Sequence, residues 1–276
     1  MDQTKKQQVK KKKEKLIPRV SHPIIETHCH LDYLEELSTT EVLQKCKEYN
    51  IEKIITIAVA PDNFQKVLDL TKNFSNIYGT QGVHPHHATT YNKNVEQQII
   101  ENSKLEKILA IGEIGLDYHY NKSPKEIQIY ALESQLEIAC QENLPVVIHS
   151  RDAEDDTIRI LEKFAPRLKR KGVIHSFTSE LRLAEKALKL GFYLGFNGII
   201  TFKNADNVRA ALKITPLSKL LLETDSPYLT PIPFRGKENA PYYLPCVAHF
   251  MSEFLDIDCE KLLKQIYSNS QSLFKI

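Results

Sequence analysis

The feature of this chain that most constrains its fold is a regular alternation of short apolar runs with longer amphipathic segments. Eight runs have the length and composition of strands, and several are apolar nearly throughout, as in strands that are covered on both faces. They are Ile24–His30, Lys53–Val59, Ile77–Val83, Ile108–Leu116, Pro145–His149, Gly172–Phe177, Phe192–Phe196 and Leu220–Thr224. Segments with helical spacing lie between them: Thr39–Tyr49, Asn63–Asn73, Val95–Lys104, Lys125–Glu142, Ala153–Phe164, Glu180–Leu190 and Asn204–Leu212. Two more helical patterns follow, near Pro245–Leu255 and Glu260–Phe274.

Eight strands that alternate with helices over about 250 residues predict an α/β fold of the (β/α)8 or TIM-barrel class. An open doubly wound sheet could also use eight strands, but the Gly-rich turn that usually follows its first strand is missing. We find no convincing internal linker, so residues 21–276 are interpreted as one barrel domain.

Residues 1–20 differ from the rest of the chain in charge. They carry a net charge of +6, whereas the remaining residues carry −4, so the overall value of +2 hides a basic arm on an acidic body. We expect the arm to be disordered, because like charges repel and nothing apolar anchors it. The alternative is a nonspecific tether for nucleic acid.

The cysteines and the hydropathy pattern predict a cytoplasmic protein. Five scattered cysteines without a CxxC pair argue against a disulfide framework or a zinc ribbon. No apolar run resembles a signal peptide or is long enough to span a bilayer, so we expect no membrane contact. The sequence suggests no protein partner.

Ionisable side chains gather at the predicted C-terminal strand ends, where barrel enzymes keep their functional residues. Glu113 lies on the fourth strand, and Glu223 and Asp225 end the eighth. Imidazole and carboxylate groups without paired thiolates suit Zn²⁺, Mn²⁺ or a similar ion, and the set exceeds what one tetrahedral ion needs. Seven of the ten histidines share this placement: His28, His30, His84, His86, His87, His149 and His175.

Each of these residues taken alone also fits a structural role. A strand-end histidine is more often hydrogen-bonded than metal-bound, Glu113 could pair with a lysine, and Asp225 could cap a turn. Their joint placement favours a two-metal site instead. Cys29 lies between His28 and His30 but points to the opposite face of the strand, so we interpret it as a core residue. Neither a phosphate-binding glycine loop nor a nucleophile elbow occurs, so NTP and serine hydrolysis are not indicated.

Six motifs that follow one another along residues 24–245 resemble those of the TatD family. The motifs are Thr27-His28-Cys29-His30-Leu31, Gly82-Val83-His84-Pro85-His86, Gly112-Glu113-Ile114-Gly115-Leu116-Asp117-Tyr118, His149-Ser150-Arg151, Glu223-Thr224-Asp225-Ser226-Pro227-Tyr228-Leu229 and Arg235-Gly236-Lys237-Glu238-Asn239-Ala240-Pro241. This resemblance implies a (β/α)8 barrel with a metal-dependent hydrolase site. The characterised members of the family include DNases with 3′→5′ exonuclease activity.

Carried over by position, the resemblance implies two divalent ions (Mg²⁺, Mn²⁺ or Zn²⁺) held by six ligands. These are His28, His30 and Asp225 on one ion, His149 and His175 on the other, and Glu113 between them. Asp225 and Glu113 would be catalytic, with Asp225 as the base or the group that orients the attacking water. We also predict four substrate contacts, His84, Arg151, Lys203 and Arg235. Arg151 could instead pair with Asp152 or Glu154, and Tyr118 and Tyr228 could stack on a base or only pack.

Three positions depart from the family pattern. Glu26 stands where the family usually has Asp, Ser176 where Cys is common, and Ser179 where Gly is common. The last change calls the conformation of this loop into question, because serine tolerates a positive φ less readily than glycine. The basic arm is not part of the family core.

Three functions are consistent with these observations. The first is a metal-dependent deoxyribonuclease that acts on DNA, on single strands or at 3′ ends. Two divalent ions would offset the −4 charge of the body, which would otherwise repel the DNA polyanion. The second is a hydrolase of another ester or amide, such as an aminoacyl ester on tRNA, because the fold does not fix the substrate. The third is a noncatalytic nucleic-acid binder, which would not need strand-end histidines.

Overall fold

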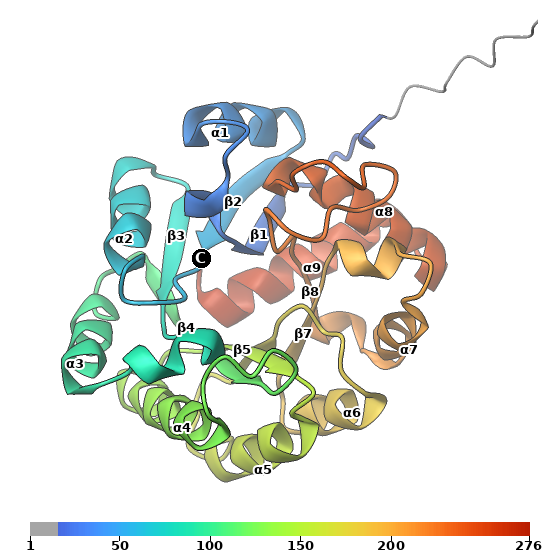
Figure 1. Ribbon diagram of the computed structural model, residues 1–276. Coiled ribbons are helices and arrows are strands. Elements are labelled where there is room, and N and C mark those ends of the chain that lie inside the picture. Colours follow the sequence, from blue (N-terminus) through green and yellow to red (C-terminus); the bar gives the residue numbers. More distant parts are fainter. Residues whose placement is uncertain (1–15) are drawn as a thin grey trace, which may run out of the picture.

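Eight parallel strands pair in chain order and form the wall of a barrel (Figure 1). They are β1 (Ile24–Cys29), β2 (Ile51–Thr56), β3 (Ile77–Gln81), β4 (Ile108–Asp117), β5 (Val146–Arg151), β6 (Gly172–Ile174), β7 (Tyr193–Phe196) and β8 (Leu220–Leu222). This computed structural model describes residues 16–276. Residues 1–15 of the predicted arm lie outside the described residues, so the arm stays a prediction.

Hydrogen bonds just past the last strand close the barrel. The Asp225 N–H donates to the His28 carbonyl at 2.9 Å, and the His30 N–H donates to the Ser226 carbonyl at 2.8 Å. The Thr27 hydroxyl donates to the Leu222 carbonyl at 3.0 Å. The predicted (β/α)8 class is therefore confirmed, and closure brings the ends of β1 and β8 together.

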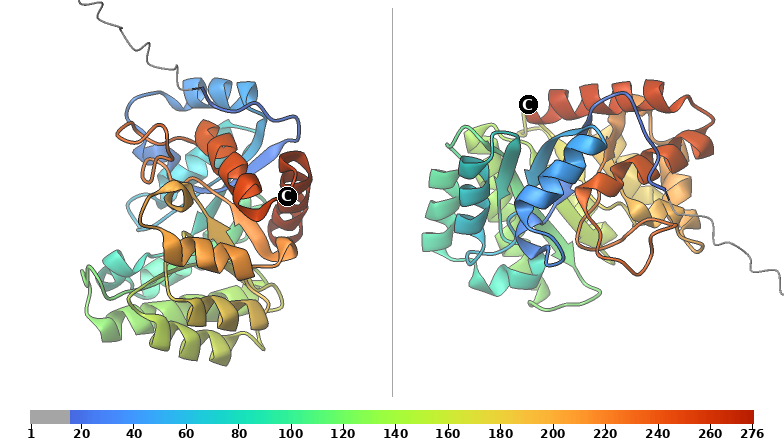
Figure 2. Two further views of the ribbon diagram at one scale, coloured as in Figure 1. Left: turned by 90° about the vertical axis from the view of Figure 1, so that its right-hand side faces the viewer. Right: turned by 90° about the horizontal axis from the view of Figure 1, so that it is seen from above.

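Helices surround the barrel on its outside (Figure 2). They are α1 (Thr39–Glu48), α2 (Phe64–Asn73), α3 (Lys93–Asn102), α4 (Lys125–Glu142), α5 (Glu154–Phe164), α6 (Leu181–Lys189), α7 (Asp206–Ile214), α8 (Leu244–Leu255) and α9 (Cys259–Phe274). Local signals set several of their ends. Ser38 and Glu41 form a capping box at α1, the Asn92 side chain caps α3, and Gly191, at φ +94°, follows the end of α6. Within residues 16–276, no helix combines the length and the apolar character needed to cross a membrane.

A buried apolar cluster fills the barrel interior at the N-terminal ends of several strands. Leu109, Val147, Val173 and Leu221 are each the second residue of their strand, and they belong to this cluster. Leu273 and Phe274 at the end of α9 also belong to it, and beside β2 it extends past the C-terminal strand end to Ala60. The C-terminal ends of the other strands carry the polar side chains of the site.

Gly115 is fixed by the close approach of β4 and β5. Its φ is +151°, and a Cβ atom there would lie 1.9 Å from the His149 carbonyl oxygen. We predict that Gly115→Ala lowers the free energy of unfolding by about 3 kcal/mol, because neither backbone can move without breaking the ladder. Chemical denaturation measures this value.

Gly236→Ala is the matched control for that prediction. Gly236 also has a positive φ of +88°, but a Cβ atom there would meet nothing within 4 Å. Its cost should be about 1 kcal/mol, from backbone strain alone. Equal losses in the two variants would show that the clash with β5 is not what requires glycine at position 115.

Candidate metal centre

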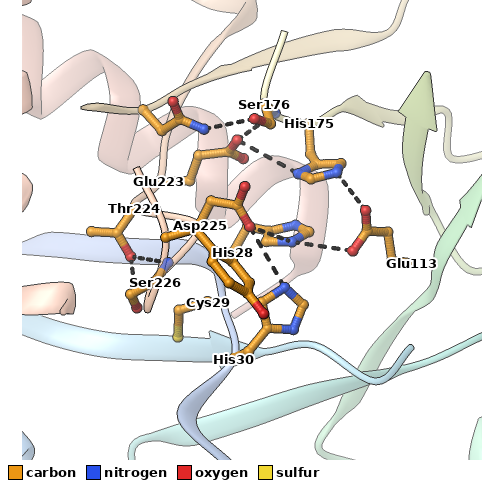
Figure 3. Close-up of polar contacts among 12 residues, drawn as sticks. His28, Cys29, His30, Glu113, His175, Ser176, Glu223, Thr224, Asp225 and Ser226 are labelled. Atoms are coloured by element: carbon orange, nitrogen blue, oxygen red, sulfur yellow. Dashed lines mark hydrogen bonds and ion pairs between the residues drawn. The ribbon is translucent and has the colours of Figure 1, made fainter. Parts of the chain in front are cut away.

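A cavity of about 940 Å³ opens at the C-terminal ends of the strands. Its lining includes His30 after β1, Glu113 on β4, His149 on β5, His175 after β6 and Asp225 after β8. Figure 3 shows Glu113 and His175 beside His28, His30 and Asp225. Alternation along β1 points Glu26, His28 and His30 to the same side, which is the interior side of the barrel. The six predicted ligands thus meet in one place, although whether each binds an ion stays a prediction.

His28, His30 and Asp225 form the first cluster of donor atoms. The Nε2 atoms of His28 and His30 lie 3.6 and 3.5 Å from Asp225 Oδ1. One donor atom from each residue lies within 4.8 Å of the others, a spacing that can hold a metal ion. The backbone of Asp225 turns at φ +58°, three residues after the end of β8.

Glu113 lies at the middle of the centre. Its Oε1 atom is 2.6 Å from His175 Nε2, 3.2 Å from His149 Nδ1 and 3.4 Å from His84 Nε2. Its Oε2 atom is 3.5 Å from His28 Nε2. Burial opposes ionisation of this carboxyl, but the surrounding imidazoles outweigh it and hold the Glu113 pKa well below its usual range.

His84, predicted as a substrate contact, lies among the possible metal ligands. With Glu113 and His149 it forms a second group of donor atoms that could hold an ion. A third group consists of His28, His175 and Glu223. Sequence reasoning placed His149 and His175 on the second ion, and His84 and Glu223 are additional donors within reach.

The donor set fits divalent cations. The Nδ1 atoms of His28, His30 and His175 are buried and lack a hydrogen-bond partner among residues 16–276. The Nε2 atoms of His28 and His175 are also buried, and they face the Glu113 carboxylate without forming a hydrogen bond to it. Such groups are costly unless something binds them. Burial and the neighbouring His175 lower the pKa of His28 to about 4, so its ring is neutral and its lone pair is free. The His28 and His175 rings stack with their centroids 3.8 Å apart.

Asp117 binds the outer ring nitrogen of His149, a role that was not predicted from the sequence. Its Oδ2 atom is 3.0 Å from His149 Nε2 and 2.9 Å from His86 Nε2. This contact leaves His149 Nδ1 to face Glu113. Burial lowers the His149 pKa, but hydrogen bonds to the two carboxylates outweigh it and raise the pKa to about 9. Strand alternation places residues 113, 115 and 117 on one face, which could have revealed Asp117.

The loop after β6 turns at Ser176, not at Ser179. Ser176 has a φ of +45°, and its N–H donates to Glu223 Oε1 at 2.5 Å. The Asn197 amide donates to its hydroxyl at 2.8 Å. The positive φ of this loop is therefore at Ser176 and not at Ser179, where the sequence comparison had suggested it. The Ser179 hydroxyl donates to the Ser150 carbonyl. The turn ends β6 earlier than predicted.

The Glu26 carboxylate, which stands where the family usually has Asp, accepts backbone hydrogen bonds. Its Oε1 atom accepts the N–H groups of His28 at 2.9 Å and of Thr224 at 3.1 Å, which ties β1 to β8. Its Oε2 atom is buried without a partner among the described residues. Burial raises the Glu26 pKa to about 8.

Asn239 of the last motif holds the loop that carries Asp225. The side chain is fully buried, and its amide donates to the Thr224 carbonyl at 3.0 Å and to the Tyr228 carbonyl at 2.5 Å. Its Oδ1 atom accepts the Ala240 N–H. The buried amide of Asn239 therefore fixes both ends of the loop around Asp225.

We predict that Asn239→Ala lowers the free energy of unfolding by about 2 kcal/mol, because the buried Thr224 carbonyl and the partly buried Tyr228 carbonyl lose their donor. Denaturant titration tests this expectation. Asn207→Ala is the control, since the Asn207 amide makes one exposed bond to the Thr178 carbonyl and its loss should cost about 0.5 kcal/mol. A loss at Asn239 no larger than that at Asn207 would contradict the role given to this amide.

The other predicted substrate contacts differ in position. Arg151 lines the cavity and lies over the Tyr120 ring at 4.8 Å; in the described residues it has no ion pair with Asp152 or Glu154. Lys203 and Arg235 are exposed and do not line the cavity, so their contacts stay predictions.

Two further interpretations concern tyrosine and cysteine side chains. Tyr118 does not line the cavity, and its hydroxyl donates to Asp156, which indicates packing. Tyr228 does line the cavity. Cys29 is fully buried in the outer apolar core, as predicted.

Comparisons with known proteins agree on one family. A sequence model of the family described as TatD related DNase matches residues 25–275. The uncharacterized metal-dependent hydrolase YabD of Bacillus subtilis is 36% identical over 255 residues, which are 92% of this chain and 99% of that protein. Deoxyribonuclease Tat-D of Schizosaccharomyces pombe is 33% identical over 84% of this chain and 86% of its own length. The crystal structure of YjjV, a TatD homologue from Escherichia coli, has a TM-score of 0.85 at 32% identity, covering 92% of this chain and 98% of that one.

Proposed function

This chain belongs to the TatD family of metal-dependent hydrolases, and we propose that it is a deoxyribonuclease that removes nucleotides from the 3′ end of DNA. The observation that carries the proposal is the position of Glu113, whose two oxygens lie within 3.5 Å of nitrogens from four histidines. A carboxylate so placed suits a centre of two divalent ions.

The proposed ligands are those that the resemblance implies: His28, His30 and Asp225 on one side, His149 and His175 on the other, and Glu113 between. When bound, two divalent ions neutralise charge on a phosphodiester and lower the pKa of the attacking water. His84 lies beside Glu113, where it can bind either an ion or a phosphate oxygen.

Asp225 is the proposed base. Burial favours its neutral form, but a hydrogen bond from His30 and the neighbouring imidazoles hold its pKa below the usual range, so it is ionised at neutral pH. Its side chain is 14% exposed, whereas that of Glu113 is 4% exposed, so Asp225 is the carboxylate more open to water. It would orient the water and accept its proton at a carboxylate oxygen.

A substrate panel tests the proposal. The protein, reconstituted with Mn²⁺, Mg²⁺ or Zn²⁺, would be given end-labelled single-stranded DNA, the matching RNA and an aminoacyl ester. We expect stepwise shortening of DNA from the 3′ end. Cleavage of the aminoacyl ester alone would overturn the proposal in favour of the second function, and binding of DNA without any hydrolysis would favour a binder.

A further inference from the structure

Two exposed tyrosine rings line the cavity on opposite sides. Tyr228 follows β8 and is 55% exposed, and Tyr120 follows β4 and is 54% exposed. The strands run around the barrel in chain order, so β8 and β1 stand across from β4 and β5 (Figure 1). Rings that are more than half exposed contribute little to packing, and exposed aromatic rings often mark binding sites.

The cationic side chains of the cavity lie on one side. Lys122 and Arg151 are the Lys and Arg side chains among its described lining residues, and both approach Tyr120, at 5.9 and 4.8 Å from the ring centre. Two carboxylates also line this side: Asp152, which is paired with His119 at 2.9 Å, and Glu154. We name this side the cationic wall (His119, Tyr120, Lys122 and Arg151); its Lys and Arg side chains supply the donors that bind phosphate groups.

The opposite side is aromatic. We name it the tyrosine wall (His30, Tyr33 and Tyr228). The Tyr33 ring stacks on His30 at 5.3 Å, and Tyr228 lies edge-on to His30 at 6.4 Å. No Lys or Arg side chain among the described lining residues lies on this wall, so its tyrosine rings suit a base better than a phosphate group.

The backbone of Tyr228 is held in place although its ring is exposed. Its carbonyl accepts the Asn239 amide at 2.5 Å, and its N–H donates to the Asp225 carbonyl at 3.0 Å. A ring on a fixed backbone loses little conformational entropy when a ligand stacks on it. Tyr228 is therefore arranged as a platform three residues from Asp225.

We propose that Tyr228 stacks on the base of the terminal nucleotide that is removed, while the cationic wall holds the phosphates of the remaining strand. The proposal rests on the proposed function. A 3′-terminal nucleoside carries no phosphate beyond the one being cleaved, which suits the aromatic tyrosine wall. The remaining strand carries a phosphate at every residue, which suits Lys122 and Arg151. A cavity of about 940 Å³ is of small-ligand size, so it admits the unpaired end of a strand.

The test compares two single-stranded DNA substrates, labelled at the 5′ end. One ends in an ordinary 3′ nucleotide, and the other ends in a sugar without a base. We expect Tyr228→Leu to lower kcat/KM roughly 10-fold on the first substrate and less than about 2-fold on the second, since base–aromatic stacking is lost only where a base is present. Tyr228→Phe should keep the wild-type rate on both.

Two further variants complete the design. Arg151→Gln should lower kcat/KM equally on both substrates, because it contacts phosphate rather than the terminal base. Tyr130→Leu should change neither rate, since Tyr130 is 52% exposed on α4 and does not line the cavity. An equal loss on both substrates with Tyr228→Leu, or no loss on either, would overturn the stacking role. If wild type cleaved neither substrate, the proposed function itself would fail.

Discussion

Glu113→Gln is expected to lower kcat/KM on single-stranded DNA at least roughly 100-fold and to weaken Mn²⁺ binding by a similar factor. The Glu113 Oε2 atom faces His28, and its Oε1 atom faces His149 and His175, so one carboxylate contacts ligands proposed for both ions. The amide keeps the shape of the side chain but removes the charge and places a donor where only acceptors fit. The measurements are steady-state kinetics and calorimetric Mn²⁺ titration.

Glu162→Gln is the matched control, because Glu162 lies on the outer surface of α5 in an ion pair with Lys186. It should change neither Mn²⁺ affinity nor turnover. If Glu113→Gln bound Mn²⁺ and cleaved DNA as wild type does, Glu113 could not link two ion sites.

Asp225→Asn is expected to lower kcat at least roughly 100-fold even at saturating Mn²⁺. The amide can still offer an oxygen toward His28 and His30, but it cannot accept a proton from water. The deficit should therefore persist when added metal has restored any lost occupancy. Rates at increasing Mn²⁺ concentration separate these two effects.

Asp155→Asn serves as its control. Asp155 is 87% exposed in its side chain and pairs with Arg182 on the protein surface. It should leave kcat unchanged. Full recovery of the Asp225→Asn rate at high Mn²⁺ would assign Asp225 to metal binding alone and would exclude it as the base.

The fold and the position of the centre were predictable because they depend on local periodicity. Alternation along β1 directs His28 and His30 to one face, and the barrel brings the strand ends together. The predicted strand after Gly172 is too long because Ser176 turns to meet Glu223, a residue 47 positions away. Sequence periodicity carries no signal for that contact.

The supporting residues were harder to predict for the same reason. The Asn239 amide donates to carbonyl groups 11 and 15 residues earlier in the chain, and the motif around Asn239 does not indicate which carbonyl groups these are. The separation of the cationic wall from the tyrosine wall depends on β4 and β5 standing across the barrel from β8 and β1. Asp117 is the exception, because alternation from Glu113 does indicate it.

The most direct test of the central claim, that hydrolysis depends on a two-ion centre, is a metal titration of activity. Protein freed of metal by a chelator would be assayed on end-labelled single-stranded DNA while Mn²⁺ is added in known equivalents. We predict no release of nucleotides without metal, and a rate that rises until two equivalents per chain are bound. Undiminished cleavage after chelation, or no cleavage at any Mn²⁺ level, would contradict the claim.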